Sequence, residues 1–82
     1  MNIIIQPSAK RGLKKLDKKI IELILRKLNS VRENPLEHIT RLKSSRLWKF
    51  RIGDYRAILL VDTKRQEIHV IKLGHRKNIY KK

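Results

Sequence analysis

A short stretch of this chain alternates basic and apolar residues and carries cations at Lys49, Arg51 and Arg56. If Gly53 and Asp54 form a two-residue hairpin loop, strand partners share a constant index sum, which places Arg51 opposite Arg56. Like charges directly opposite destabilise a strand pair by part of the ~0.2–1 kcal/mol that such pairs are worth. A bound phosphate would offset the repulsion, because guanidinium groups donate charge-assisted hydrogen bonds to its oxygens. The pattern indicates a phosphate site, with a solvated basic strand face as the alternative.

Further basic residues follow near the end of the chain. The last expected strand ends at Leu73, which a four-residue turn places beside Arg56. Residues 74–76, with the sequence Gly-His-Arg, then leave the sheet next to the same cations, and Tyr80 follows. His75 is a candidate acid–base group, but a lone loop histidine is more often exposed or hydrogen-bonded than catalytic. Four cationic side chains and a phenol are therefore expected on one concave face: Lys49, Arg51, Arg56, Arg76 and Tyr80.

The acidic residues and histidines lack the spacing of a metal site. The 7 Asp and Glu residues form no cluster for Mg²⁺ or Zn²⁺, and neither His38 nor His69 has a second ligand at a suitable spacing. Metal-dependent nuclease chemistry is therefore disfavoured, and no cofactor is expected.

The length and net charge of the chain limit its possible fold and partners. A chain of 82 residues supports one modest core, so we expect a single domain spanning residues 1–82. Lys and Arg number 22 against 7 Asp and Glu, a net charge of +15 spread over both halves of the chain, which predicts an anionic partner for the folded body. Cysteine is absent and no apolar run approaches the ~20 residues of a membrane span, so the cytoplasm is the expected compartment.

The apolar spacing predicts an α+β domain of order β-α-α-β-β-β, with an N-terminal helical hairpin packed on one face of a small antiparallel sheet. A strand over residues 2–6 stops at Pro7, and the Ser8 hydroxyl is expected to cap a helix that begins near Ala9. Asp17 is the expected N-cap of a second helix, which ends before Pro35. A polar link then covers residues 36–45, and strands are expected over residues 47–52, 55–62 and 67–73.

Apolar side chains are expected to fill one side of each element. A helical stripe with steps of three and four comprises Leu13, Leu16, Ile20, Ile24, Leu28 and Val31, and it is widened by Ile21 and Leu25. On the strands, Trp48 and Phe50 fall on the apolar face, so both are expected in the core rather than stacked on bases. Tyr80, outside the strands, is the better stacking candidate.

Two motifs of this sequence occur together in a known family. One is Leu42-Lys43 followed by the segment 47–56, LWKFRIGDYR, and the other is Gly-His-Arg at 74–76 with Tyr80. On these residues and on its element order, nearly the whole chain resembles RelE-like toxins of the RelE/ParE superfamily. Ser44 departs from the pattern, because the family commonly has Gly after Leu-Lys.

The resemblance implies a metal-independent endoribonuclease that cuts mRNA on the ribosome, by attack of a ribose 2′-hydroxyl on the adjacent phosphate. Lys49 and Arg51 resemble the cations that assist deprotonation of the hydroxyl and hold the phosphate, and Arg56 resembles the one that stabilises the pentacovalent phosphate. Arg76 resembles the group that serves the leaving 5′-oxygen, and Tyr80 would orient or stack the nucleotide. Four further basic residues are expected to contact RNA: Lys43, Arg46, His75 and Lys77.

The implied partners are the ribosome, mRNA and an acidic antitoxin, with a toxin–antitoxin heterotetramer as one arrangement and no membrane contact. Two other functions stay open. The superfamily includes ParE-like inhibitors of DNA gyrase, which generally lack the complete basic set. A non-catalytic RNA-binding or ribosome-binding module would also explain a charge of +15 and a basic face.

Overall fold

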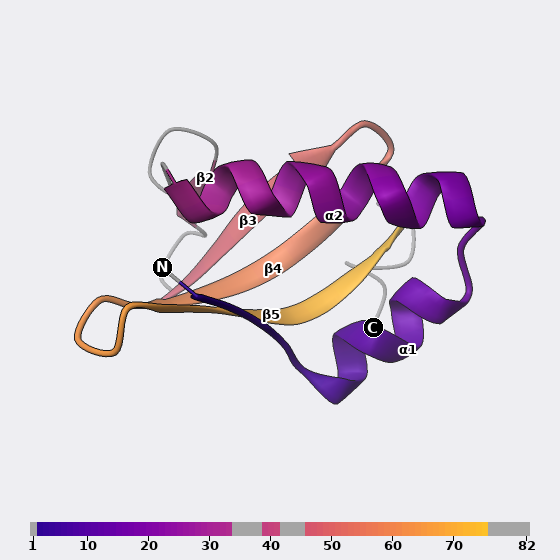
Figure 1. Cartoon of the computed structure of the whole chain (residues 1–82). Helices are drawn as coiled ribbons and strands as arrows, with labels where there is room; N and C mark the ends of the chain where they lie inside the picture. The colour runs from indigo at the N-terminus through magenta and orange to yellow at the C-terminus, as the bar shows by residue number, and fades with distance from the viewer. Residues whose placement is uncertain (1, 34–38, 42–45, 76–82) are drawn as a thin grey trace.

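The computed structural model describes residues 2–33, 39–41 and 46–75. One five-stranded sheet has the strand order β1-β5-β4-β3-β2. Helix α2 lies across one face of this sheet, and α1 lies beside the end of β5 (Figure 1). The elements are β1 (Asn2–Ile5), α1 (Pro7–Lys14), α2 (Lys18–Glu33), β2 (Ile39–Arg41), β3 (Leu47–Ile52), β4 (Tyr55–Asp62) and β5 (Glu67–His75). The α+β class is as predicted, and the predicted helices and strands occur in the predicted order with one additional strand, β2.

Two features of the sheet differ from the expectation. The sheet is mixed, because β1 pairs in parallel with β5, from Asn2 beside Glu67 to Ile5 beside Val70. A purely antiparallel sheet was therefore the wrong prediction, since the apolar pattern of a strand does not encode the direction of its neighbour. The predicted polar link also contains β2, whose three residues are too few to show a period of two.

Both helices contribute to one core on the covered face of the sheet. Ile24, Leu28 and Val31 of α2 are buried, and Ala9 of α1 is fully buried. The spacing of three and four residues between the buried side chains of α2 is that of the predicted stripe, to which Ala9 did not belong. Leu25 does not join it, because it lies at the edge of the stripe and remains 43% exposed. No helix within residues 2–33, 39–41 and 46–75 is long and apolar enough to cross a membrane.

The starts of the two helices follow different rules. Helix α1 begins at Pro7, where the missing N–H costs nothing, and Ser8 lies inside the first turn. The Ser8 hydroxyl donates to the carbonyl of Ile71 instead of capping α1, so the predicted cap is wrong. Asp17 directly precedes α2, and its carbonyl accepts a hydrogen bond from the Ile21 N–H at 2.9 Å, as expected of an N-cap residue.

Helix α1 runs along the part of β5 that β1 leaves open. The Gln6 N–H donates to the carbonyl of Val70 at 3.0 Å, just before the helix begins. A Cβ atom added to Gly12 would lie 2.0 Å from the carbonyl oxygen of Leu73. The helix therefore approaches the strand backbone so closely that only glycine fits at position 12, and it protects the β5 edge from pairing with another chain.

Candidate active site

The hairpin of β3 and β4 has the predicted register. Arg51 pairs with Arg56 and Lys49 pairs with Ile58. Gly53 has a φ of 57° and is the only glycine with positive φ among the described residues, whereas Asp54 has negative φ. This is the pattern of a type II′ turn, whose twist suits a two-residue hairpin. The two arginines thus occupy the same face of the sheet.

That face is the one opposite the helices. Phe50 and Ile52 of β3 are buried in the core, and Trp48 packs against the core as a partly buried side chain. Successive side chains of a strand point to opposite faces, so Lys49 and Arg51 project to the other side. The core positions predicted for Trp48 and Phe50 are confirmed, and the three cations Lys49, Arg51 and Arg56, which we call the basic cluster, lie on the open face.

The three members of the basic cluster differ in exposure. Arg51 is exposed, and its Nε atom donates a long hydrogen bond of 3.4 Å to the carbonyl of Gly53. Lys49 and Arg56 are half-buried, and the Nε atom of Arg56 is inaccessible to solvent. A half-buried guanidinium has fewer rotamers than an exposed one, so its charge is held at a defined position before a substrate arrives.

A β-bulge changes the predicted neighbour of Arg56. The pairing of β4 with β5 shifts between Ile58 and Leu59, so Arg56 pairs with Gly74, and Leu73 pairs with Ala57. Strand β5 also continues past Leu73 instead of ending there. The predicted register had no bulge, which inserts one extra residue into one strand and cannot be read from apolar alternation.

The shifted register leaves room beside Arg56. Gly74 has no side chain, and a Cβ atom added there would meet nothing within 4 Å. Because cross-strand partners share a face, this open space lies on the same side as the guanidinium of Arg56. The arrangement therefore leaves open space beside Arg56, at the centre of the basic cluster.

The same register moves His75 out of the cluster. His75 pairs with Tyr55, and Tyr55 packs against the core, so both residues lie on the core side of the sheet. The two rings make an edge-to-face contact with centroids 5.5 Å apart and an interplanar angle of 80°. The structure thus places His75 on the face opposite Arg51 and Arg56, and not beside the cations as expected.

The remaining predicted residues are distributed as follows. Arg46 is exposed and lies just before β3, at the end of the sheet away from the β3–β4 turn. Four predicted site residues lie outside the described residues, namely Lys43, Arg76, Lys77 and Tyr80.

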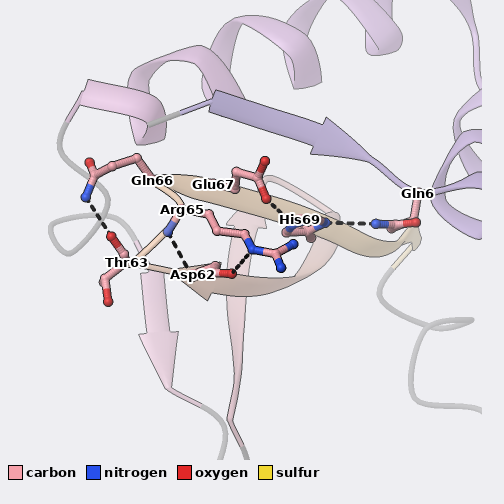
Figure 2. Close-up of polar contacts among 7 residues, drawn as sticks. All are labelled: Gln6, Asp62, Thr63, Arg65, Gln66, Glu67 and His69. Atoms are coloured by element: carbon pink, nitrogen blue, oxygen red, sulfur yellow. Dashed lines mark hydrogen bonds and ion pairs between the residues drawn. The ribbon is translucent and has the colours of Figure 1, made fainter.

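A polar network that the sequence did not predict joins Gln6, between β1 and α1, to two residues of β5 (Figure 2). Gln6 Nε2 donates to His69 Nδ1 at 2.8 Å, and His69 Nε2 donates to Glu67 Oε1 at 3.1 Å. Both ring nitrogens are therefore engaged, which suits a structural role more than proton transfer. The sequence signal for this contact is that Glu67 and His69 are two residues apart on one strand, so their side chains lie on the same face. No group of three or more potential metal-ligating side chains lies together in the described part of the chain.

Comparison with known proteins identifies the family. A family model described as the ParE toxin of the type II toxin–antitoxin system parDE matches residues 3–80. The chain belongs to the RelE/ParE toxin family. It is therefore a toxin of a type II toxin–antitoxin system, as the motifs around the basic cluster suggested. A search of curated proteins finds no significant match to this toxin.

Solved structures show the same fold. The toxin–antitoxin complex RelBE2 of Mycobacterium tuberculosis matches with a TM-score of 0.83 and 20% identity, over 92% of this toxin and 96% of that chain. The archaeal RelE–RelB complex of Pyrococcus horikoshii matches with a TM-score of 0.79 and 24% identity, over 94% of this toxin and 96% of that chain. The YoeB/ParE toxin of Agrobacterium tumefaciens matches with a TM-score of 0.78 and 18% identity, over 93% of this toxin and 99% of that chain. At these identities the similarity establishes the fold alone.

Proposed function

We propose that this toxin is an endoribonuclease that cuts mRNA presented by the ribosome, without a metal ion. The observation that carries the proposal is the pairing of Arg51 with Arg56 on the open face, with Lys49 on the same side. Such a concentration of charge costs folding energy unless an anion binds there. The scissile phosphate of RNA is an anion of the right size, and its charge grows as the reaction proceeds.

In this mechanism the ribose 2′-oxygen attacks the adjacent phosphorus, the bond from phosphorus to the 5′-oxygen breaks, and a cyclic phosphate and a 5′-hydroxyl result. Lys49 and Arg51 hold the phosphate and favour loss of the 2′-hydroxyl proton. Arg56, the most restrained of these cations, stabilises the charge of the pentacovalent phosphate, and a preorganised donor of this kind is worth several kcal/mol. By resemblance, Arg76 assists the leaving 5′-oxygen and Tyr80 orients the nucleotide.

Dependence on the ribosome follows from the side chains that surround the scissile phosphate in this proposal. His75 faces the other side of the sheet, and both ring nitrogens of His69 are engaged in hydrogen bonds. The basic cluster therefore has no histidine from the described residues to move protons efficiently. Alignment of the 2′-hydroxyl with the leaving oxygen must therefore contribute a larger share of the rate enhancement than proton transfer does. A ribosome that holds mRNA in a fixed conformation provides such alignment. Because ribosomes translate mRNA in the cytoplasm, this proposal also implies that the toxin acts there.

We expect purified toxin to cut mRNA in a reconstituted translation reaction and to leave the same mRNA intact when ribosomes are omitted. Primer extension on the recovered mRNA measures the cuts. The match to the ParE family model favours a second candidate, inhibition of DNA gyrase. A gyrase supercoiling and DNA-cleavage assay should run in parallel. Gyrase-dependent DNA breaks with intact mRNA would support gyrase inhibition. No effect in either assay would favour the third function, a non-catalytic RNA-binding module.

The proposed protein partner is an acidic antitoxin that covers the basic cluster, alone or in a toxin–antitoxin heterotetramer. Complementary charge between a +15 protein and an acidic partner would speed association and oppose wrong partners. We expect toxin purified from its own host at low salt to carry an acidic protein, with an affinity that falls as salt is raised. Mass spectrometry and binding at two salt concentrations test this. A basic partner whose binding ignores salt, or no partner, would contradict it.

A further inference from the structure

A second basic site lies at the other end of β3. There the start of β3, the end of β4 and the turn after it surround an open hollow of about 560 Å³. Its size is in the range of small-ligand sites, roughly 300–1,000 Å³. The described residues that define it include Arg41, Arg46, Trp48, Val61, Asp62 and Lys64.

This hollow is separate from the paired arginines of the basic cluster because it lies at the other end of β3. Its lining takes side chains from both faces of the sheet: Leu60 and Asp62 share the face of Arg56, whereas its aromatic and arginine side chains lie on the core side. Arg41 pairs with Trp48, and Trp48 packs toward the core side. Leu47 pairs with Leu60, so the same register continued by one residue places Arg46 level with Val61, also on the core side. In Figure 1, helix α2 ends near β2 at this end of the sheet.

An aromatic platform already forms one wall. The guanidinium carbon of Arg41 lies over the Trp48 ring, 5.6 Å from its centroid. The inner side of Trp48 packs against the core, which holds the ring in place. Unpaired nucleic-acid bases stack on both aromatic rings and guanidinium planes, and one stacked base is worth about 1–3 kcal/mol. A base is therefore the flat group that this pair fits.

The opposite wall is a turn with a defined shape. The Asp62 carboxylate accepts a hydrogen bond from the Arg65 N–H at 3.1 Å and lies 3.9 Å from the Arg65 side chain. Gln66 Nε2 donates to the carbonyl of Thr63 at 2.8 Å (Figure 2). Among the described residues, Asp62 is the only acidic group of the hollow, and it is thus engaged by its own turn. Lys64, at the tip, and Arg46, across the hollow, are both exposed cations.

We propose that this hollow binds one unpaired nucleotide of single-stranded RNA, as a subsite distinct from the basic cluster. The base stacks against the Arg41–Trp48 pair, and Arg46 and Lys64 hold the flanking phosphate. An acidic peptide would satisfy the cations but would leave the flat platform unused, so the nucleotide fits both features. The subsite goes beyond the proposed cleavage activity, which concerns the basic cluster nearer the β3–β4 turn.

The test uses Trp48 as its own reporter, because it is the single tryptophan of the chain. Full-length toxin is titrated with a six-nucleotide single-stranded oligoadenylate while tryptophan emission is followed. We expect a saturable change in emission, and no such change with hexaglutamate. Arg46→Ala and Lys64→Ala should each lower the slope of log affinity against log salt by about 0.7, the value for one phosphate contact on a single strand. Lys19→Ala, an equal charge change at the exposed start of α2, should alter the slope less.

Two results would overturn the subsite. One is an equal emission change in wild type and in the Arg46→Ala/Lys64→Ala double variant, which would place the RNA elsewhere. The other is an equal change with hexaglutamate, which would assign the hollow to an acidic peptide. Loss of mRNA cleavage does not enter this readout, so failure of the proposed nuclease and failure of the subsite are distinguishable.

Discussion

Arg56→Ala is expected to lower the rate of ribosome-dependent mRNA cleavage about 10²- to 10³-fold, the usual cost of removing one preorganised donor from a reacting charge. Arg56 is half-buried, pairs with Arg51 and faces the open space left by Gly74. Its side chain is thus restrained and lies beside open space. No other described cation combines these properties with a place at the centre of the basic cluster.

Stability should respond much less than activity to this substitution. Removing one of two facing cations relieves repulsion, while loss of the half-buried stem removes packing, and the two effects oppose one another. We expect the free energy of unfolding to change by less than about 1 kcal/mol, measured from the urea midpoint.

Two further variants sharpen this first prediction. Arg56→Lys keeps the charge but loses the planar fork of donors, so its cleavage rate should fall between wild type and Arg56→Ala. Lys19→Ala removes one exposed charge from α2, which covers the other face of the sheet (Figure 1), and it should cleave like wild type. If Arg56→Ala and Lys19→Ala cleave mRNA equally fast, the basic cluster is not the active site.

Gly12→Ala is expected to destabilise the fold by about 1–3 kcal/mol, the range for overpacking a tight site. Helix propensity alone predicts the opposite sign, because alanine is favoured over glycine inside a helix by about 0.8–1.0 kcal/mol. The added Cβ would lie 2.0 Å from the Leu73 carbonyl oxygen, a backbone atom that cannot rotate away. Helix α1 would have to move off β5, which would disturb the hydrogen bonds from Gln6 to Val70 and from Ser8 to Ile71.

The matched control is Gly74→Ala, where a Cβ atom meets nothing within 4 Å and φ is not positive. Its free energy of unfolding should stay within about 0.5 kcal/mol of wild type. Gly53→Ala tests a different cause, because φ of +57° at this turn costs an alanine roughly 1–2 kcal/mol without any clash. Urea unfolding of the three variants should rank Gly12→Ala or Gly53→Ala as least stable and Gly74→Ala as closest to wild type. A Gly12→Ala protein as stable as Gly74→Ala would mean that α1 does not approach β5 this closely.

The parts of the site that could be predicted are those set by neighbouring residues. The Gly53-Asp54 loop fixes the β3–β4 register by its length, so the pairing of Arg51 with Arg56 follows from counting. Alternation along β3 likewise separates Phe50 in the core from Lys49 on the open face. The steps of three and four in α2 identify Ile24 and Leu28 as core residues in the same way.

Contacts between distant segments decided the rest. The bulge in β5 places Gly74 opposite Arg56 and turns His75 to the other face, and no local pattern marks where an extra residue enters a strand. Pairing of β1 with β5 in parallel joins the two ends of the chain, so its direction depends on the course of everything between them. The hollow around Trp48 likewise combines β2, β3 and the turn after β4, which come together only in the folded sheet. Short-range spacing therefore determined which residues share a face, whereas long-range packing decided which of them meet.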